Sequence, residues 1–349
     1  MTDNPALPSR DRLLEVVGAM AGRPVVMLVD LVADRFITGA PKRISREAPV
    51  LILRHEREEF VPGGGANAVA NVRALGGEPL PLGVVGDDES GRLLLAALAE
   101  RGVVTDGVTV RAGYRTPTKT RVLAGGRHAI KQQVVRYDVE DQVTLEPADV
   151  ERLGNTLTGW ARRAAVAVLS DYGYGAVPPE LTGAVRGALA EPATVLADSR
   201  YRLAEFQGLD GATPNEEEAE ALLGEPLSDE PAAFRAAGRL LRDRLGSRFL
   251  LITRGSEGMS LFLADGCLHL PVHGSEQVAD VTGAGDTVIG AFALALAAGA
   301  TPAEAALLAN YAGGLVVMKA GTATISPGEL RDAVAADRAT LEASRWEAY

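Results

Sequence analysis

Three apolar runs that each end in an aspartate constrain the fold of this chain most strongly. The runs read VVMLVD, VLSD and LAD, and they end at Asp30, Asp171 and Asp198. Continuous apolar runs are typical of parallel strands buried on both faces of a sheet. The first run continues as LVAD, so we expect its strand to reach Asp34. Ligands in open α/β sheets bind beyond the carboxyl ends of the strands, which predicts the active site at this edge.

The order of the expected elements predicts one α/β domain over residues 1–349. From Pro147 onward, strand patterns alternate with helical ones. Two segments, 35–60 and 114–138, mix charged and β-branched residues with Gly and Pro and are expected to form exposed strands. We therefore predict a doubly wound, mostly parallel sheet flanked by helices, with a small β-sheet lid built from these two insertions.

The composition excludes several classes of function. Lys and Arg number 35 against 46 Asp and Glu, so a net charge of -11 argues against a nucleic acid or an anionic membrane as the main partner. Cys267 is the only cysteine, which excludes an intramolecular disulfide and a cysteine-based zinc cluster and fits a reducing cytosol. We find no signal peptide, and we expect a cytoplasmic protein.

The stretch DVTGAGDTVIGA, from Asp280 to Ala291, carries the most specific chemistry. Its Gly-Ala-Gly turn opens an apolar helix, so the backbone N–H groups of Gly283, Ala284 and Gly285 would face an anion at the positive end of the helix dipole. With Asp286 beside them to accept a hydroxyl proton, the arrangement indicates phosphoryl transfer. The alternative is an ordinary turn with a helix-capping acid.

The glycine-rich stretch VPGGGANAVANVRALGG, residues 61–77, allows two interpretations. Gly63, Gly65 and Ala68 fit the dinucleotide fingerprint G-x-G-x-x-G/A, with Asp87 and Asp88 further on, which would indicate an NAD-dependent oxidoreductase. That motif should follow a buried strand, however, and the preceding RHEREEFVP is charged and ends in a proline. The glycines then serve to bring the backbone close to some other ligand.

The helix start GAGD together with the upstream turn GGxxAN resembles the ribokinase-like (PfkB) carbohydrate kinase family. The resemblance implies transfer of the γ-phosphoryl group of ATP to a sugar, with Asp286 as the base. It also implies that Gly63, Gly64, Asn67 and Asp34 hold the sugar hydroxyls.

Further matches imply the nucleotide and cation sites. Asn215 and Glu218 resemble the N-x-x-E motif that supports Mg²⁺ through water, although a capped helix with an acidic first turn would read the same. Asp280 and Thr282 resemble part of a monovalent-cation (K⁺) site. The positions that resemble the nucleotide-binding turn and the adenine site are Thr253, Gly255, Gly258 and Asn310.

Within the family, the chain is most similar to the heptose 7-phosphate kinase branch, through stretches such as RISREAPV, QQVVRYD, LSDYG and GTATISP. The LSDYG match implies a sugar-binding role for Asp171. Two lysines expected near the sugar are missing, because Tyr174 and Arg200 stand in their places, and Arg46 replaces a proline. The chain stops soon after GTATISPGEL, so we expect no nucleotidyltransferase half.

The acceptor expected from this resemblance is a sugar phosphate. Arg43 and Arg200 are expected to bind its phosphate, among a basic group that also includes Lys42, Arg46, Lys119 and Arg121. These cations would otherwise be a solvated face of the lid, and the acceptor an unphosphorylated sugar or nucleoside. A catalytically silent sugar-binding regulator is a further alternative. The resemblance also implies a homodimer that pairs through the β lid.

Overall fold

A computed structural model describes residues 7–126, 131–274, 279–337 and 339–349. Over these residues the chain forms a ten-stranded sheet, in the order β14-β13-β12-β11-β10-β9-β8-β1-β4-β5, and a four-stranded sheet, in the order β3-β2-β6-β7. The strands of the large sheet are β1 Pro24–Val29, β4 Glu78–Gly86, β5 Val108–Arg111, β8 Val166–Asp171, β9 Thr194–Ser199, β10 Gly211–Ala212, β11 Phe249–Thr253, β12 Met259–Phe262, β13 Gly266–Leu270 and β14 Arg345–Ala348. The strands of the small sheet are β2 Leu31–Ile44, β3 Leu51–Gly64, β6 Thr118–Ala124 and β7 Gln132–Val139.

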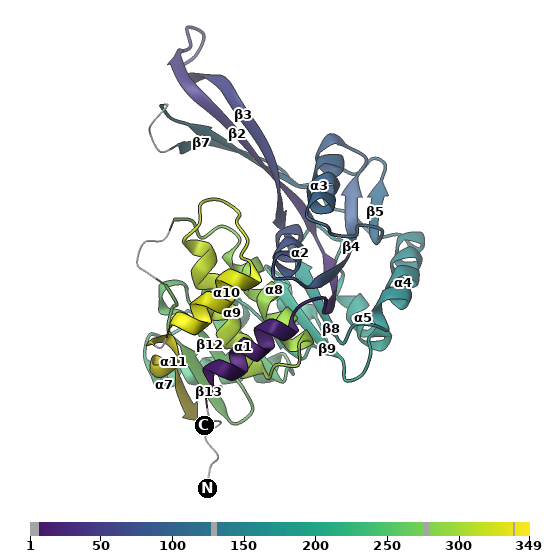
Figure 1. The fold of residues 1–349 in the computed structure, drawn as a ribbon. Coiled ribbons are helices and arrows are strands. Elements are labelled where there is room, and N and C mark those ends of the chain that lie inside the picture. Colours follow the sequence, from purple (N-terminus) through teal and green to yellow (C-terminus); the bar gives the residue numbers. More distant parts are fainter. Residues whose placement is uncertain (1–6, 127–130, 275–278, 338) are drawn as a thin grey trace.

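The large sheet is parallel from β5 through β11, and β12, β13 and β14 continue it in antiparallel pairing. Helices cover both of its faces (Figure 1). The predicted α/β fold with a mostly parallel sheet and a second, smaller sheet is therefore confirmed. The helices are α1 Arg10–Ala19, α2 Gly65–Ala74, α3 Glu89–Glu100, α4 Pro147–Ala161, α5 Thr182–Ala188, α6 Glu216–Leu223, α7 Pro231–Arg244, α8 Ala284–Ala297, α9 Pro302–Val317, α10 Pro327–Ala336 and α11 Ala339–Ala343.

Two apolar clusters lie on opposite faces of the large sheet, and strand β1 shows why its sequence is continuously apolar. Val25, Met27 and Val29 belong to the cluster that includes residues of α1, α2, α8 and α9. Val26 and Leu28 belong to the cluster that includes residues of α4, α5 and α7. Because successive side chains of a strand point to opposite faces, a strand covered on both sides needs apolar residues at every position.

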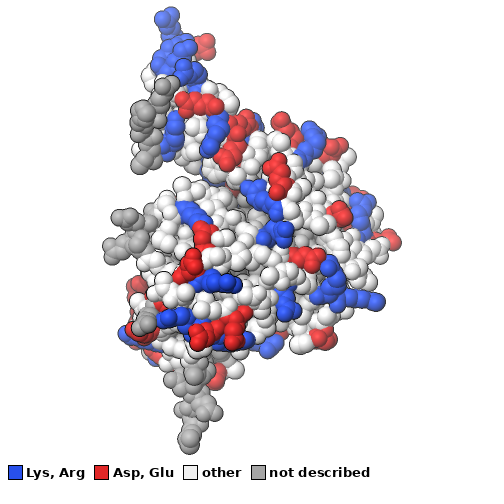
Figure 2. Space-filling model, in the orientation of Figure 1, with Lys and Arg blue, Asp and Glu red and all other residues white. Residues whose placement is uncertain are grey.

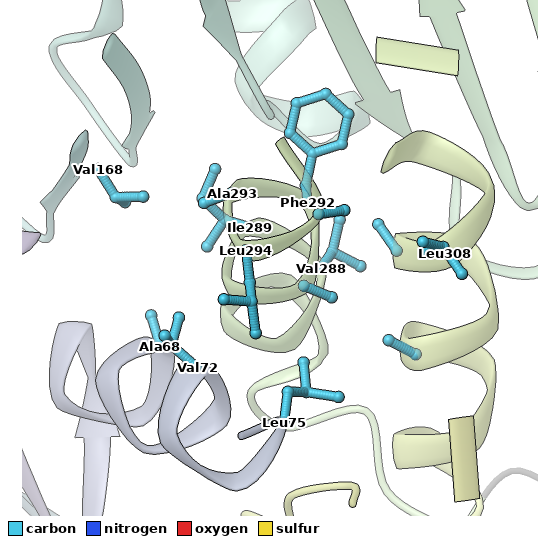
Figure 3. Packing of buried hydrophobic residues seen from close by; sticks show 14 of the residues in the cluster. Ala68, Val72, Leu75, Val168, Val288, Ile289, Phe292, Ala293, Leu294 and Leu308 are labelled. Carbon is cyan, nitrogen blue, oxygen red and sulfur yellow. The ribbon is translucent and has the colours of Figure 1, made fainter. Parts of the chain in front are cut away.

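Helix α8 lies in the middle of the first cluster (Figure 3). Its residues from Asp286 to Ala295 are all buried, which confirms the buried helix that the apolar run predicts. Leu294 points toward α2, which carries Ala68 and Val72, and Leu308 of α9 lies on the other side of α8 (Figure 3). Small alanines let these helices approach closely, so α8 is packed on several sides.

The first apolar run differs from its prediction, because it contains two strands in different sheets. Strand β1 ends at Val29, and β2 begins at Leu31 and pairs with β3 and β6. The break falls at Asp30, whose carboxylate accepts hydrogen bonds from the backbone N–H groups of Tyr172 (2.8 Å), Tyr174 (2.9 Å) and Ala176 (3.0 Å). The expectation that one strand reaches Asp34 is therefore wrong: Asp30 lies at the edge of the large sheet, and Asp34 lies within β2.

The small sheet is built from the two segments that we expected to form exposed strands. Its strands begin and end somewhat outside the expected ranges, since β2 starts at Leu31 and β3 runs to Gly64. The β2–β3 hairpin projects from the rest of the molecule, and β7 lies beside it (Figure 1).

Among the described residues, no helix combines the length and the apolar character needed to cross a bilayer.

Candidate active site

The site is centred on the turn that starts helix α8. Gly283 caps the helix with a left-handed φ of 78°, and Asp286 is the third residue of the helix, as the GAGD motif predicts. Asp286 is 3% exposed. Burial raises its pKa to about 7, although hydrogen bonds from Asn67 and Tyr172 act in the opposite direction. A carboxylate with a pKa near neutrality suits a general base.

Two side chains hold the carboxylate of Asp286. The Asn67 Nδ2 donates to one oxygen at 3.0 Å, and the Tyr172 hydroxyl donates to the other at 2.7 Å. Tyr172 follows directly after strand β8, at the edge where we expected the site. Sequence reasoning missed it, although it is the tyrosine of the LSDYG stretch.

Asn67 is placed differently from the expectation that it binds the sugar. It is 2% exposed and does not line the cavity that holds Asp286. Besides Asp286, its amide donates to the carbonyl of Gly283 (3.3 Å), and its oxygen accepts from Asn71 Nδ2 (3.2 Å). The reason is that α2 packs directly against α8, so that the polar atoms of Asn67 are satisfied within the protein.

The three glycines at the junction of β3 and α2 bring the backbone close to the site. A Cβ at Gly63 would lie 2.5 Å from Asp34 Oδ2, and one at Gly65 would lie 2.6 Å from Val29 Cβ. Gly64 has a φ of 50° and lines the cavity. The turn follows β3, a strand of the small sheet that is exposed over most of its length, so it lacks the buried strand of a dinucleotide motif.

A cavity of about 470 Å³ lies between the small sheet, the carboxyl edge of the large sheet and the start of α8. It brings together most of the residues predicted from the sequence, although they are far apart along the chain. The predicted residues among its lining are Asp34, Gly64, Asp171, Arg200, Asn215, Glu218, Thr253, Thr282, Gly283, Ala284, Gly285 and Asp286.

The small sheet contributes charged side chains to this cavity. Asp34 is 3% exposed and forms an ion pair with Arg121 at 2.5 Å. Lys119 lies over the ring of Tyr172, 5.3 Å from its centroid, and burial lowers its pKa. Arg200, which follows β9, lies over the ring of Tyr201. Within the described part of the chain neither Lys119 nor Arg200 forms an ion pair, so both cations are available to an anionic ligand.

Asp171 lines the cavity, but its carboxylate is engaged by the protein. It accepts hydrogen bonds from Arg202 (2.6 Å), from the Ser199 hydroxyl (2.7 Å) and from the Gly173 backbone N–H (3.1 Å). Its side chain is fully buried in the ion pair with Arg202. These contacts indicate that Asp171 shapes the cavity wall and leaves little capacity for a sugar.

Acidic groups from β9, α6 and α8 also line the cavity. Asn215 and Glu218 form a capping box at the start of α6, as the alternative interpretation of their motif predicts, and both also line the cavity. Burial raises the pKa of Glu218. Burial, followed by the neighbouring carboxylates of Glu218 and Asp286, raises the pKa of Asp198 well above its usual range. The closeness of these carboxylates leaves this part of the cavity with concentrated negative charge.

A second cavity, of about 350 Å³ and mostly apolar lining, adjoins the first. Thr253, Val281, Ala284 and Gly285 line both cavities. Gly255, Gly258 and Asn310, which we expected around a nucleotide, line only the second. Asn310 is 2% exposed and donates to the carbonyl of Pro271 at 2.7 Å.

Some of the predicted residues lie outside both cavities. Lys42, Arg43 and Arg46 are exposed in the projecting part of the β2–β3 hairpin, where Figure 2 shows basic side chains gathered at its tip. Arg43 therefore does not line the cavity of Asp286, and its role in binding the acceptor stays a prediction. Tyr174 also lies outside the cavity of Asp286, with its hydroxyl 3.4 Å from Glu140 Oε1.

The expected monovalent-cation residues lie at the loop before α8. The carboxylate of Asp280 accepts hydrogen bonds from the backbone N–H groups of Thr282 (2.9 Å) and Gly321 (3.2 Å). Thr282 lines the first cavity, and Asp280 does not. The described residues contain no group of three or more His, Cys, Asp or Glu side chains placed to hold a metal ion.

Comparison with known proteins agrees with this geometry. The chain is 41% identical over 313 residues to the bifunctional protein HldE of Pelobacter propionicus. The aligned residues cover 89% of this chain and 63% of that protein. It is 40% identical to the bifunctional protein HldE of a Caulobacter species, over 92% of this chain and 64% of that protein. The chain thus spans just under two thirds of the length of these relatives.

Solved structures share the fold. Phosphofructokinase-2 from Escherichia coli superposes with a TM-score of 0.71 at 20% identity, over 90% of this chain and 99% of that one. Ribokinase from Arabidopsis thaliana, solved with ribose and ATP, superposes with a TM-score of 0.69 at 22% identity, over the same shares. Residues 25–328 match the pfkB family carbohydrate kinase, and they include both cavities and the turn that holds Asp286. This chain therefore belongs to the pfkB family of carbohydrate kinases and is a phosphotransferase that acts on a sugar hydroxyl.

Proposed function

We propose that this protein transfers the γ-phosphoryl group of ATP to a sugar phosphate, with heptose 7-phosphate and its anomeric hydroxyl as the leading acceptor, and that Asp286 is the general base. The position of Asp286 carries the proposal. It is buried at the start of α8, and the backbone of Gly283, Ala284 and Gly285 lies beside it on the wall of the cavity. The carboxylate would accept the hydroxyl proton while the N–H groups stabilise charge on the phosphoryl group.

The second cavity would hold the nucleotide. Its apolar lining suits an adenine ring, and Thr253, Gly255, Gly258 and Asn310 would surround that ring. Glu218, with Asn215, would hold Mg²⁺ through water among the carboxylates of the first cavity, where the ion would neutralise phosphate charge.

Asp280 and Thr282 offer the hard oxygen ligands that K⁺ takes. Activity in KCl that clearly exceeds activity in choline chloride would support this cation site, and equal activity would remove it.

The choice of a phosphorylated acceptor is supported by two free cations. Lys119 and Arg200 line the cavity of Asp286 without an ion pair among the described residues. A guanidinium can bind phosphate with two parallel hydrogen bonds, so Arg200 can take the place of the missing lysine. Heptose as the sugar rests on the sequence resemblance and on the relatives named HldE, which are about 40% identical to this chain.

The base is tested by Asp286→Asn. We expect this variant to fold and to bind ATP with Mg²⁺, because the amide keeps the size of the carboxyl group. Its turnover should fall by roughly 10²- to 10⁴-fold, the usual contribution of a positioned base. Turnover is measured by coupled detection of ADP, and ATP binding by thermal shift. Near-normal turnover would remove Asp286 from this role.

The acceptor is tested by comparing heptose 7-phosphate with fructose 6-phosphate, ribose and nucleosides. For a phosphorylated acceptor, Arg200→Ala should raise the acceptor KM by roughly 10- to 150-fold, the scale of a lost hydrogen bond to a charged group, and leave the KM for ATP unchanged. Arg92→Ala, at an exposed arginine on α3, is the matched control. Higher kcat/KM on an unphosphorylated acceptor, unaffected by Arg200→Ala, would contradict the proposal.

A further inference from the structure

We infer that Tyr172 is a positioning residue for phosphoryl transfer: its hydroxyl holds the carboxylate of Asp286, and Asp30 holds the segment that carries Tyr172. The inference rests on the proposed role of Asp286 as the base. It adds a residue from the edge of the large sheet, which the glycine and aspartate motifs of the sequence do not identify.

The contact between the two side chains is close and partly buried. The Tyr172 hydroxyl donates to Asp286 Oδ1 at 2.7 Å, and Tyr172 lines the same cavity as Asp286. Burial, followed by the charge of Asp286, raises the pKa of Tyr172 well above its usual range, so that the hydroxyl stays protonated and remains a donor. A donor to an ionised oxygen is the stronger kind of hydrogen bond, and it fixes the plane of the carboxylate.

Asp30 fixes the backbone of the segment that carries Tyr172. The Asp30 carboxylate is 1% exposed and accepts hydrogen bonds from the N–H groups of Tyr172, Tyr174 and Ala176. Gly175, in the same segment, has a φ of 94°, and a Cβ there would lie 2.0 Å from the Val143 carbonyl oxygen. The segment is therefore held at several points, and the carboxylate of Asp30 is linked to Asp286 through Tyr172.

The groups around Asp286 come from several elements and differ in their effect on its charge. From α2, Asn67 donates to the carboxylate and favours its ionised form, and the cation of Lys119 on β6 acts in the same direction. Asp34 on β2 carries like charge and favours the protonated form of Asp286. Asp198 on β9 lies near enough that the charge of Asp286 contributes to its own raised pKa. The pKa of about 7 leaves Asp286 sensitive to each of these groups.

Loss of the Tyr172 hydroxyl should act mainly on the acid side of the pH profile. The hydrogen bond stabilises the ionised carboxylate, so its removal raises the pKa of Asp286 further. The base must be ionised to accept a proton, and a raised pKa depletes the ionised form at low pH but scarcely at high pH. A purely structural role for Tyr172 would lower activity equally at every pH.

The experiment compares Tyr172→Phe with the wild type at pH 6.5 and pH 8.5, with ATP, Mg²⁺ and heptose 7-phosphate, or the best acceptor of the panel above. We expect the loss of kcat at pH 6.5 to exceed the loss at pH 8.5 by about fivefold, which corresponds to a pKa shift of about one unit. Tyr174→Phe is the matched control, because it removes a hydroxyl from the same segment that does not reach Asp286. It should show the same relative activity at both pH values.

Two further variants separate the possible failures. Asp30→Asn keeps the Tyr172 hydroxyl but weakens its anchor, and it should reproduce the larger loss at pH 6.5 if Tyr172→Phe folds poorly. If Asp286→Asn is inactive while Tyr172→Phe and Asp30→Asn lose activity equally at both pH values, the inference is overturned and the proposed base stands. If Asp286→Asn retains near-normal turnover, the proposed base itself fails.

Discussion

At the scale of single residues, Gly283 is a position in the site that needs a glycine. Its φ is 78°, and a Cβ at this position would lie 2.3 Å from Asn67 Nδ2, the group that donates to Asp286. Gly285, two residues further on, has open space around the position of a Cβ. The two glycines of the GAGD motif therefore do different work, and only the first depends on the absence of a side chain.

We predict that Gly283→Ala lowers the free energy of unfolding by at least about 1 to 2 kcal/mol, the cost of a left-handed backbone for a residue with a Cβ. The new methyl group also displaces Asn67, so turnover should fall with stability. Gly285→Ala is the control, and its unfolding free energy should stay within about 0.5 kcal/mol of the wild type. Urea unfolding measures both. Equal stability of the two variants would show that the turn tolerates a side chain at position 283.

At the scale of elements, helix α10 is tied to the end of α9 by a charged pair. Glu329 forms a capping box with Ser326 at the start of α10, and Lys319 lies 2.6 Å from its carboxylate. The hydrogen bond from Lys319, with those from Ser326, lowers the pKa of Glu329 to about 2. A lowered carboxyl pKa contributes stability that is present above the unfolded value of 4.5 and is lost as the pH falls toward 2.

We therefore predict that Glu329→Gln destabilises the protein at pH 7 by roughly 0.5 to 1 kcal/mol, a range reduced because the pair is exposed to solvent. The difference from the wild type should shrink as the pH is lowered from 4.5 toward 2. Thermal unfolding over this range checks the prediction. Asp332→Asn, at an exposed acid of the same helix, should have no such pH-dependent effect. A difference that stays constant with pH would mean that the charge of Glu329 is not involved.

The elements also show what could be predicted from the sequence. The buried strands that end at Asp171 and Ser199, and helix α8, follow from apolar runs and a glycine turn, which are local signals. The break at Asp30 could not be predicted, because the residues on both sides are buried and the pattern stays apolar when the chain changes sheets.

Among the site residues, local motifs point to Asp286 and the glycines before it, but they do not reveal which distant side chains contact Asp286. Asn67 meets Asp286 across 219 residues, and Tyr172 meets it across 114. No local pattern reports such a contact. The position of Arg43 depends on the direction of a long hairpin, which strand propensity does not determine.

At the scale of the whole molecule, the small sheet has two faces of different character. One face of strands β6 and β7 lines the cavity with Lys119, Arg121 and Arg136. Successive side chains of a strand point to opposite faces, so the residues next to these three in the sequence lie on the other face. On that face Val135 is 54% exposed and Tyr137 is 61% exposed. We propose that this exposed apolar surface pairs with a second copy of the chain in a homodimer, since such side chains on a sheet favour burial against a partner.

If two copies pair through this face, Val135→Lys should give a monomer, because the substitution places a charge in the proposed interface. Sedimentation velocity at micromolar concentration measures the change in mass. Leu240→Lys, at an exposed leucine of α7, is the control and should leave the dimer intact. A wild-type protein that sediments as a monomer, or a Val135→Lys variant that sediments as a dimer, would contradict pairing through this face.

Ala284 and Gly285 line both cavities, so the two cavities share a wall at the start of α8. A donor in one cavity and an acceptor in the other would meet at the same backbone, so the protein has no need to carry the phosphoryl group itself. We expect a ternary complex with both substrates bound and inversion of configuration at phosphorus. Labelled ADP should then not exchange into ATP without the acceptor, and rapid exchange would instead indicate a phosphorylated enzyme.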